Sequence, residues 1–114
     1  MIDVKRGEIW LVNLDPTVGH EIKKPRPGVI IQNDIGNKYS PITIIAPITS
    51  QNIDRVSPIE VLLGNVKGLK KESKVLLNQI RAIDKIRLIK KLDKLHQDNL
   101  IKIDEAIKIS LDLM

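Results

Sequence analysis

An arginine held between two prolines is the residue of this sequence whose type and setting most clearly suit chemistry. Arg26 stands in the run Lys24-Pro25-Arg26-Pro27-Gly28, where the flanking prolines restrict its backbone. The planar guanidinium matches phosphate oxygens with two parallel hydrogen bonds and stays charged at neutral pH. Thr49 and Ser50 follow a β-branched run and add hydroxyl groups that can orient a phosphate oxygen. Together these groups suit the stabilisation of negative charge on a phosphate.

RNA is a phosphate substrate that brings part of the chemistry itself. Its 2′-hydroxyl attacks the adjacent phosphorus while the 5′-oxygen leaves, so a protein has to promote proton transfer and stabilise the phosphate oxygens. Spacing alone favours a simpler interpretation, in which Arg26 is a surface residue of a turn and Thr49-Ser50 are polar residues that close a strand. The residues leave open which group would deprotonate the 2′-hydroxyl.

Most other catalytic chemistries lack their residues in this chain. There is no cysteine, which removes thiol nucleophiles, disulfides and cysteine-ligated zinc. The two histidines, His20 and His96, stand far apart and the acidic residues are scattered, so we expect no metal site and no cofactor. No glycine-rich phosphate loop follows a strand, and no Gly-x-Ser-x-Gly turn occurs.

Charge is unevenly distributed along the chain. The net charge is +5 over 114 residues. Residues 67–94 form a basic segment in which three acidic residues oppose Lys67, Lys70, Lys71, Lys74, Arg81, Lys85, Arg87, Lys90, Lys91 and Lys94. A basic half indicates a polyanionic partner such as nucleic acid, although lysines on a solvated face explain the same composition.

The N-terminal residues carry no pattern typical of a signal peptide, because an acidic residue comes at once and no apolar run follows Lys5-Arg6. The apolar run from Ile42 to Ile48 is too short to span a bilayer and contains Pro47. We expect one domain over residues 1–114, located in the cytoplasm and with no membrane partner.

Strands are the elements that must position these residues. Residues 8–14, 29–33, 43–48 and 59–63 are rich in Ile, Val and Leu and predict strands, with a fifth over 74–83. Residues 15–27 hold three prolines and several charges without periodicity, which indicates a long surface loop. We expect a turn over 33–37, and Pro47 marks an edge or a bulge in the third strand.

The C-terminal part of the chain predicts a helix over residues 98–112. Leu100, Ile103, Ile107 and Leu111 recur at helical spacing, and Asp98 is a candidate N-cap. Residues 84–95 fit either a helical stripe or a turn followed by a strand. Five short strands and a closing helix predict a mainly β fold, a small antiparallel β-barrel with a C-terminal α-helix. With only two aromatic residues, Trp10 is expected in the core rather than under a stacked base.

Four blocks of this sequence resemble the MazF/PemK family, the toxin halves of bacterial type II toxin–antitoxin pairs. The blocks agree in order and spacing, the likeness covers nearly the whole chain, and it is closest to MazF-type toxins of Gram-positive bacteria. They are Arg6-Gly7-Glu8-Ile9-Trp10, Arg26 to Asn33, Ile48-Thr49-Ser50, and Gln79-Ile80-Arg81-Ala82-Ile83-Asp84.

The resemblance implies a fold, an activity and partners. The fold is the SH3-like β-barrel of the CcdB/MazF-like plasmid maintenance toxins, assembled as a homodimer. The activity is that of an mRNA interferase, a sequence-specific, ribosome-independent and metal-independent endoribonuclease that cuts single-stranded RNA and arrests growth. A MazE-like antitoxin occupies the RNA groove and neutralises the toxin, and DNA is bound only indirectly, through the antitoxin complex.

The resemblance also implies roles for particular residues. The catalytic arginine of the family falls on Arg26 and the catalytic threonine on Thr49, and a loop glutamate reported in some members matches Glu21, which is the third residue expected to be catalytic. The residues expected to contact RNA are His20, Ser50, Gln51, Gln79 and Arg81. For His20, a solvated loop residue is a simpler interpretation than a general base, and Asn33 is expected to be a turn residue.

Two other functions stay open on the sequence. One is a non-catalytic, CcdB-like poison that binds DNA gyrase through its C-terminal helix, and the other is a barrel that binds RNA without cutting it. Discrete cleavage of RNA in EDTA distinguishes the endoribonuclease from both. The RNA motif depends on the geometry of residues 15–24 and 52–56, which propensities do not fix, and the sequence does not identify the antitoxin.

Overall fold

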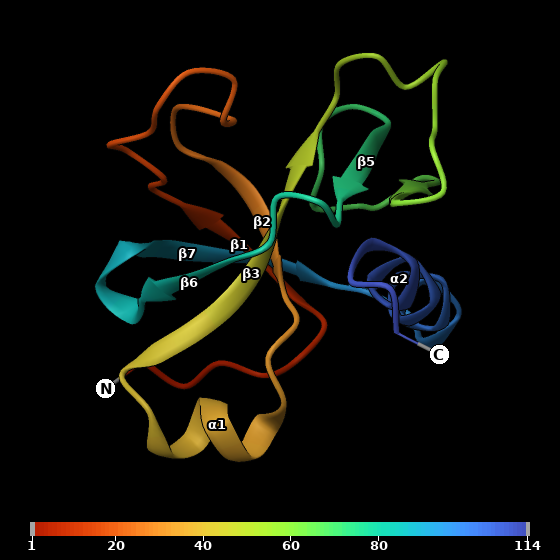
Figure 1. Cartoon of the computed structure of the whole chain (residues 1–114). Coiled ribbons are helices and arrows are strands. Elements are labelled where there is room, and N and C mark those ends of the chain that lie inside the picture. The colour runs from red at the N-terminus through yellow and green to blue at the C-terminus, as the bar shows by residue number, and fades with distance from the viewer. Residues whose placement is uncertain (1, 114) are drawn as a thin grey trace.

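The computed structural model describes residues 2–113; Met1 and Met114, the end residues of the expected domain, lie outside the described residues. An antiparallel sheet with neighbours in the order β4-β5-β3-β2-β1-β7 dominates the fold, and β6 pairs with β3 off this path (Figure 1). The strands are β1 (Glu8–Val12), β2 (Arg26–Ile30), β3 (Ile42–Thr49), β4 (Glu60–Leu63), β5 (Ser73–Leu76), β6 (Arg81–Asp84) and β7 (Leu88–Lys94). The prediction of a mainly β fold with a C-terminal helix is confirmed.

Strand β3 is the centre of the sheet because it changes partners along one edge. Residues 42–45 pair with β6, residues 48 and 49 pair with β5, and β2 pairs with β3 on the other edge. Pro47 is buried and falls between the parts that pair with β6 and β5. The sequence predicted an edge or a bulge at Pro47. Strand β3 is central rather than an edge strand, but the side that faces β6 and β5 has no partner at Pro47, and a missing N–H is tolerated there.

The strand predicted over residues 74–83 is two strands, β5 and β6, separated by a turn. The N–H of Gln79 donates to the carbonyl of Leu76 at 3.2 Å and closes that turn. Residues 84–95 adopt the second of the two expected alternatives, a 3₁₀ turn η1 (Lys85–Arg87) followed by β7. The turn expected over 33–37 is instead a short helix, α1 (Asp34–Tyr39), whose N-cap Asn33 accepts a hydrogen bond from the Gly36 N–H at 2.8 Å.

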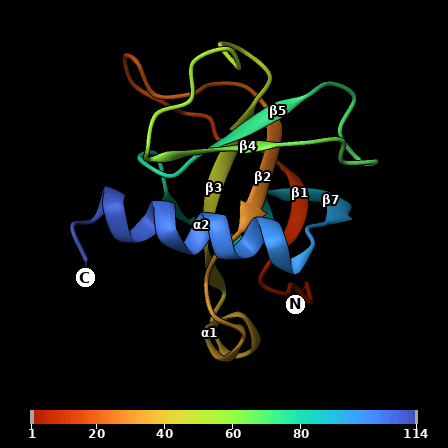
Figure 2. The same ribbon diagram turned by 90° about the vertical axis from the view of Figure 1, so that its right-hand side faces the viewer.

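Helix α2 (Gln97–Ser110) crosses the sheet beside β4 (Figure 2). Its N-cap is His96 without a side-chain hydrogen bond, so the assignment of Asp98 as N-cap was wrong; Asp98 lies in the first turn, where its charge favours the helix dipole. On the expected apolar face Ile103 is fully buried, while Leu111 is half-exposed. The main core cluster packs between this face and the sheet.

The loops that follow β1 and β3 project from the same end of the sheet, and α1 lies at the opposite end (Figures 1 and 2). A second buried cluster, which includes Val12, Ile30 and Ile45, lies under the half-buried Trp10. Between residues 2 and 113 no helix combines the length and the apolar character that crossing a membrane requires. The end that carries the two loops also carries Arg26 and Thr49.

Candidate active site

Pairing between β2 and β3 brings Arg26 and Thr49 to the same end of neighbouring strands. Gly28 pairs with Pro47 and Val29 with Ala46, and the same register continued by two residues sets Arg26 beside Thr49. Both residues line one groove of about 560 Å³. The two residues that the sequence singled out, 23 positions apart, therefore share a site because of strand register.

The groove that contains Arg26 and Thr49 is strongly basic. Its ionisable lining residues, within the described part of the chain, are cations without a carboxylate: Lys24, Arg26, Lys70, Lys71 and Lys90. Apolar residues also line the groove, among them Leu11, Leu69 and Leu92. Ser50 and Gln51, which the resemblance predicts to contact RNA, line it as well. Such a lining favours a polyanion that has some apolar surface.

Hydrogen bonds to the preceding loop fix the orientation of the Arg26 guanidinium. Its Nε and Nη2 both donate to the carbonyl oxygen of Lys23, at 2.8 and 2.5 Å. Burial lowers the pKa of Arg26 from its ordinary value, but an arginine keeps its proton at neutral pH. Because a guanidinium has five N–H donors, the donors that Lys23 does not occupy can bind an anion in the groove.

The residues after β3 form a short hydrogen-bonded turn. The hydroxyl oxygen of Thr49 accepts a hydrogen bond from the Gln51 N–H at 3.1 Å, which leaves its own O–H proton available. Thr49 is half-buried, and Ser50 and Gln51 are exposed. A hydroxyl held in this way can donate to a phosphate oxygen in the groove.

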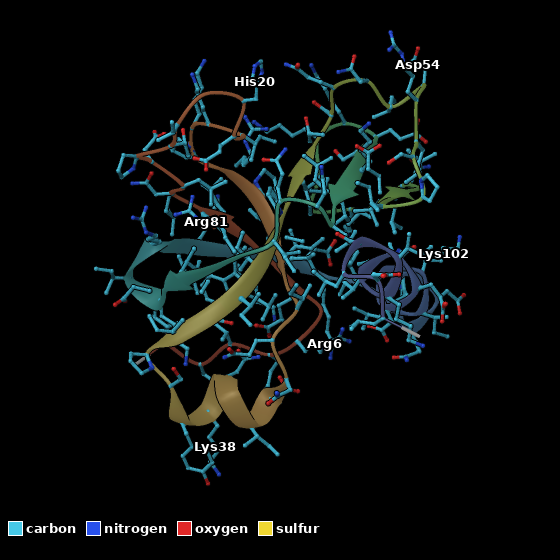
Figure 3. All side chains as sticks on the ribbon, in the orientation of Figure 1. Arg6, His20, Lys38, Asp54, Arg81 and Lys102 are labelled. Carbon is cyan, nitrogen blue, oxygen red and sulfur yellow. The ribbon has the colours of Figure 1, made fainter. Side chains whose placement is uncertain are left out.

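The remaining predicted residues lie in a second cavity, of about 690 Å³. His20 and Glu21 from the loop after β1 line it together with Gln79 and Arg81 from the β5–β6 turn and the start of β6. Figure 3 shows His20 on the outer part of that loop and Arg81 nearer the middle of the molecule. The structure thus separates the eight predicted residues into two groups of four, one around Arg26 and one around Arg81.

Gln79 and Arg81 hold the long loop at both of its ends. Nη1 of Arg81 donates to the Leu14 carbonyl at 3.0 Å, where the loop begins. The Gln79 side-chain oxygen accepts from the Ile22 N–H at 2.9 Å, shortly before the loop ends. The Glu21 carboxylate is occupied within the loop, where it accepts from the Val18 N–H at 2.7 Å. Two of the residues expected to contact RNA, Gln79 and Arg81, therefore also fix the loop that leads into Arg26.

A buried lysine that the sequence did not single out fixes the other loop. Lys74 pairs with Thr49 across β3 and β5, and its ammonium donates to Glu60 at 3.0 Å and to the Arg55 carbonyl at 2.7 Å. Burial works to raise the pKa of Glu60, but the Ser57 N–H and Lys74 outweigh it, so the pKa is lowered. A paired carboxylate and ammonium thus tie the loop after β3 to the strand opposite Thr49.

The loop between β4 and β5 is fixed against β7 at Gly68. Its N–H donates to the Asp93 carboxylate at 2.8 Å, and a Cβ at this position would lie 2.4 Å from the Leu92 carbonyl oxygen. Hydrogen bonds from the N–H groups of Lys94 and Gly68 lower the pKa of Asp93. This contact fixes the loop that supplies Leu69, Lys70 and Lys71 to the groove. In the described residues there is no cluster of three or more His, Cys, Asp or Glu side chains that could hold a metal ion.

Comparison with known sequences matches nearly the whole chain. The family model described as PemK-like, MazF-like toxin of type II toxin–antitoxin system matches residues 5–111. The Endoribonuclease EndoA of Bacillus subtilis (strain 168) is 44% identical over 112 residues, which cover 97% of each chain.

Solved structures agree in fold. MazF of Deinococcus radiodurans superposes with a TM-score of 0.86 at 23% identity, covering 99% of this chain and 100% of that one. A MazE–MazF structure from the same organism gives a TM-score of 0.79 at 22% identity, with both chains fully covered. The Mycobacterium tuberculosis toxin MazF-mt6 gives 0.80 at 25% identity, covering 94% of this chain and 98% of that one. None of these comparisons supports the CcdB-like alternative. The chain belongs to the PemK-like, MazF-like toxin family of type II toxin–antitoxin systems.

Proposed function

We propose that this protein is the toxin of a type II toxin–antitoxin pair and an endoribonuclease that cuts single-stranded RNA. The observation that carries the proposal is the groove in which Arg26 and Thr49 lie together and whose ionisable lining, in the described residues, is cationic. A polyanion with reactive phosphodiester bonds suits such a groove. Membership of the family and the likeness to an endoribonuclease of Bacillus subtilis support the same activity.

The groups of the groove match the needs of attack by the 2′-hydroxyl. The 2′-hydroxyl loses its proton to a base as the 2′-oxygen bonds to the adjacent phosphorus. The bond from phosphorus to the 5′-oxygen breaks, which leaves a 2′,3′-cyclic phosphate on one product, and the 5′-oxygen takes up a proton to become a 5′-hydroxyl on the other. Negative charge grows on the non-bridging oxygens, where Arg26 supplies a positive fork and Thr49 a hydroxyl donor. None of these steps requires a metal ion as a participant.

We assign Glu21 and His20 to contacts with the nucleotides beside the cut rather than to the cut phosphate. Both line the second cavity, whose other polar lining includes Asn78, Gln79 and Arg81. Carboxamide, imidazole and guanidinium groups suit the edges of unstacked bases. In this proposal the residues of the groove around Arg26 cut the RNA, and the residues of the second cavity select the RNA sequence.

The partners follow from the family. We propose that the substrate in the cell is mRNA in the cytoplasm, that the toxin acts as a homodimer, and that a MazE-like antitoxin neutralises it. Solved MazE–MazF complexes support the antitoxin. A negatively charged antitoxin segment suits the basic groove and would exclude RNA from it by competition.

Replacement of Arg26 tests the activity. Purified protein is incubated in EDTA with a labelled single-stranded RNA, and the ends of the products are sequenced. We expect discrete cuts with 5′-hydroxyl ends, and for Arg26→Ala a rate lower by about 10²-fold, the usual cost of removing one donor to a developing oxyanion.

Two controls separate chemistry from folding. Arg26→Lys keeps the charge but not the fork, so we expect an intermediate rate. Added guanidinium ion should partly restore Arg26→Ala, which a misfolded variant would not show. Cleavage by folded Arg26→Ala at the rate of the unmodified protein would contradict the assignment, and intact RNA with the unmodified protein would overturn the proposed function.

A further inference from the structure

The chemistry proposed above uses only part of the positive charge in the groove. Arg26 and Thr49 act at the phosphate that is cut, and this leaves the lysines of the same groove without a role. In the described residues Lys70, Lys71 and Lys90 are all exposed, and none forms an ion pair. Like charges gathered without a carboxylate among them repel one another, so the free protein gains nothing electrostatically from this arrangement.

These three lysines come from elements of the groove other than the strand that carries Arg26. Lys90 pairs with Leu11 across β7 and β1, and Leu11 pairs with Pro27 across β1 and β2. Two strand spacings, or about 10 Å, therefore separate the backbones of Lys90 and Pro27. Lys70 and Lys71 come from the loop between β4 and β5, which reaches the groove from the opposite edge of the sheet.

The loop that carries Lys70 and Lys71 is held in place by the contact of Gly68 with β7. The Asp93 carboxylate accepts the Gly68 N–H at 2.8 Å, and the loop backbone lies too close to Leu92 for a side chain at position 68. The strand that holds the loop also carries Lys90. The two backbone segments that carry the three lysines are thus joined at Gly68, although they belong to different elements.

We propose that Lys70, Lys71 and Lys90 form a phosphate-binding wall that holds RNA backbone phosphates other than the one that is cut. The proposal rests on the proposed function, because it places the RNA in the groove of Arg26. Lysine ammonium groups bind phosphates as point charges and read no bases. The wall therefore gives affinity that is independent of sequence, while the second cavity selects bases.

The dependence of RNA affinity on salt tests the wall. The probe is a fluorescent single-stranded RNA with every 2′-hydroxyl methylated, which cannot be cut, and its dissociation constant is measured at several salt concentrations. Each phosphate neutralised on a single strand contributes about 0.7 to the slope of log affinity against log salt. We expect the slope to fall by about 1.4 in the double variant Lys70→Gln/Lys71→Gln and by about 0.7 in Lys90→Gln.

A matched control removes the same charge elsewhere. Lys38 on α1 and Lys102 on α2 are exposed and do not line the groove; Lys38 lies at the end opposite the loops and Lys102 at the side of the molecule (Figure 3). The double variant Lys38→Gln/Lys102→Gln should keep the slope of the unmodified protein. Equal slopes for both double variants and the unmodified protein would overturn the wall, as would equal reductions in both. Cleavage of unmodified RNA is assayed separately. The cleavage assay tests the proposed function and the binding assay tests the wall, so failure of one proposal is distinguished from failure of the other.

Discussion

Replacing Gly68 with alanine tests how firmly the loop between β4 and β5 is fixed to β7. The added methyl group would lie 2.4 Å from the carbonyl oxygen of Leu92 and 2.9 Å from its carbonyl carbon. Ordinary contact begins near 3.4 Å, so the loop has to retreat by about 1 Å, the difference between these distances. Strand β7 cannot easily move instead, because it pairs with β1 from Glu8 to Val12.

The free-energy cost of this displacement can be estimated from the hydrogen bond that it breaks. A displacement of about 1 Å stretches the Gly68 N to Asp93 Oδ2 distance from 2.8 Å to beyond hydrogen-bonding range. A hydrogen bond to a charged group contributes about 1.5–3 kcal/mol, and water recovers part of it because Asp93 is only half-buried. Residual crowding adds to the loss. We expect the free energy of unfolding to fall by about 1–3 kcal/mol.

Urea unfolding at one fixed protein concentration measures this change, since the stability of the proposed homodimer would depend on concentration. The matched control is Gly64→Ala in the same loop, where an added Cβ meets no atom within 4 Å. We expect that control to stay within about 0.5 kcal/mol of the unmodified protein. A loss below about 0.5 kcal/mol in Gly68→Ala, or an equal loss in both variants, would refute the reasoning from close approach.

Two further predictions concern the contact of Gln79 with the loop between β1 and β2, and the contact of Asp93 with the loop between β4 and β5. Gln79→Ala removes the acceptor of the Ile22 N–H, a hydrogen bond worth about 1 kcal/mol. The loop should then open about fivefold more often, and tryptic cleavage after Lys23 should be faster by the same factor. An unchanged rate, or the same increase in Asn78→Ala, would contradict this anchoring role. The pKa of Asp93 lies below its ordinary 3.8 in the folded protein, so its stabilising effect is complete at neutral pH and is lost as the pH falls through the folded value. Asp93→Asn should therefore flatten the acid side of the curve of unfolding free energy against pH, and an unchanged curve would show that Asp93 does not contribute to it.

Strands with a clear apolar pattern could be predicted from the sequence, and turns inside apolar runs could not. Leu76, Leu77 and Ile80 continue the pattern of β5 through the turn before β6, so periodicity gives no sign that the chain reverses there. Helix α1 is too short to show a period, and Gly36 within it argues against a helix. Its one local signal is Asn33, which suits a helix cap as well as a turn.

That Arg26 and Thr49 share a site could be predicted from motifs and family resemblance. The arrangement of the residues around them could not. Whether Gln79 lines the same cavity as Arg26 depends on how strands pair, which local sequence does not determine. Lys74 faces Thr49 only because of the β3–β5 register, and Gly68 meets Asp93 across 25 positions of sequence. The basic segment 67–94 did contain three of the groove lysines, Lys70, Lys71 and Lys90, but its composition does not show which of its cations converge.

The two hydrogen bonds from Arg26 to the Lys23 carbonyl have a consequence for the energetics of substrate capture. A free arginine side chain has about 2 kcal/mol of rotamer entropy, and part of it is normally lost when a ligand is bound. Here the fork is already confined by its own loop, so much of this loss occurs when the protein folds. The orientation of the guanidinium also becomes a property of the backbone at Lys23. Small changes of that loop would then change the reactivity of the protein without altering any group that touches the phosphate.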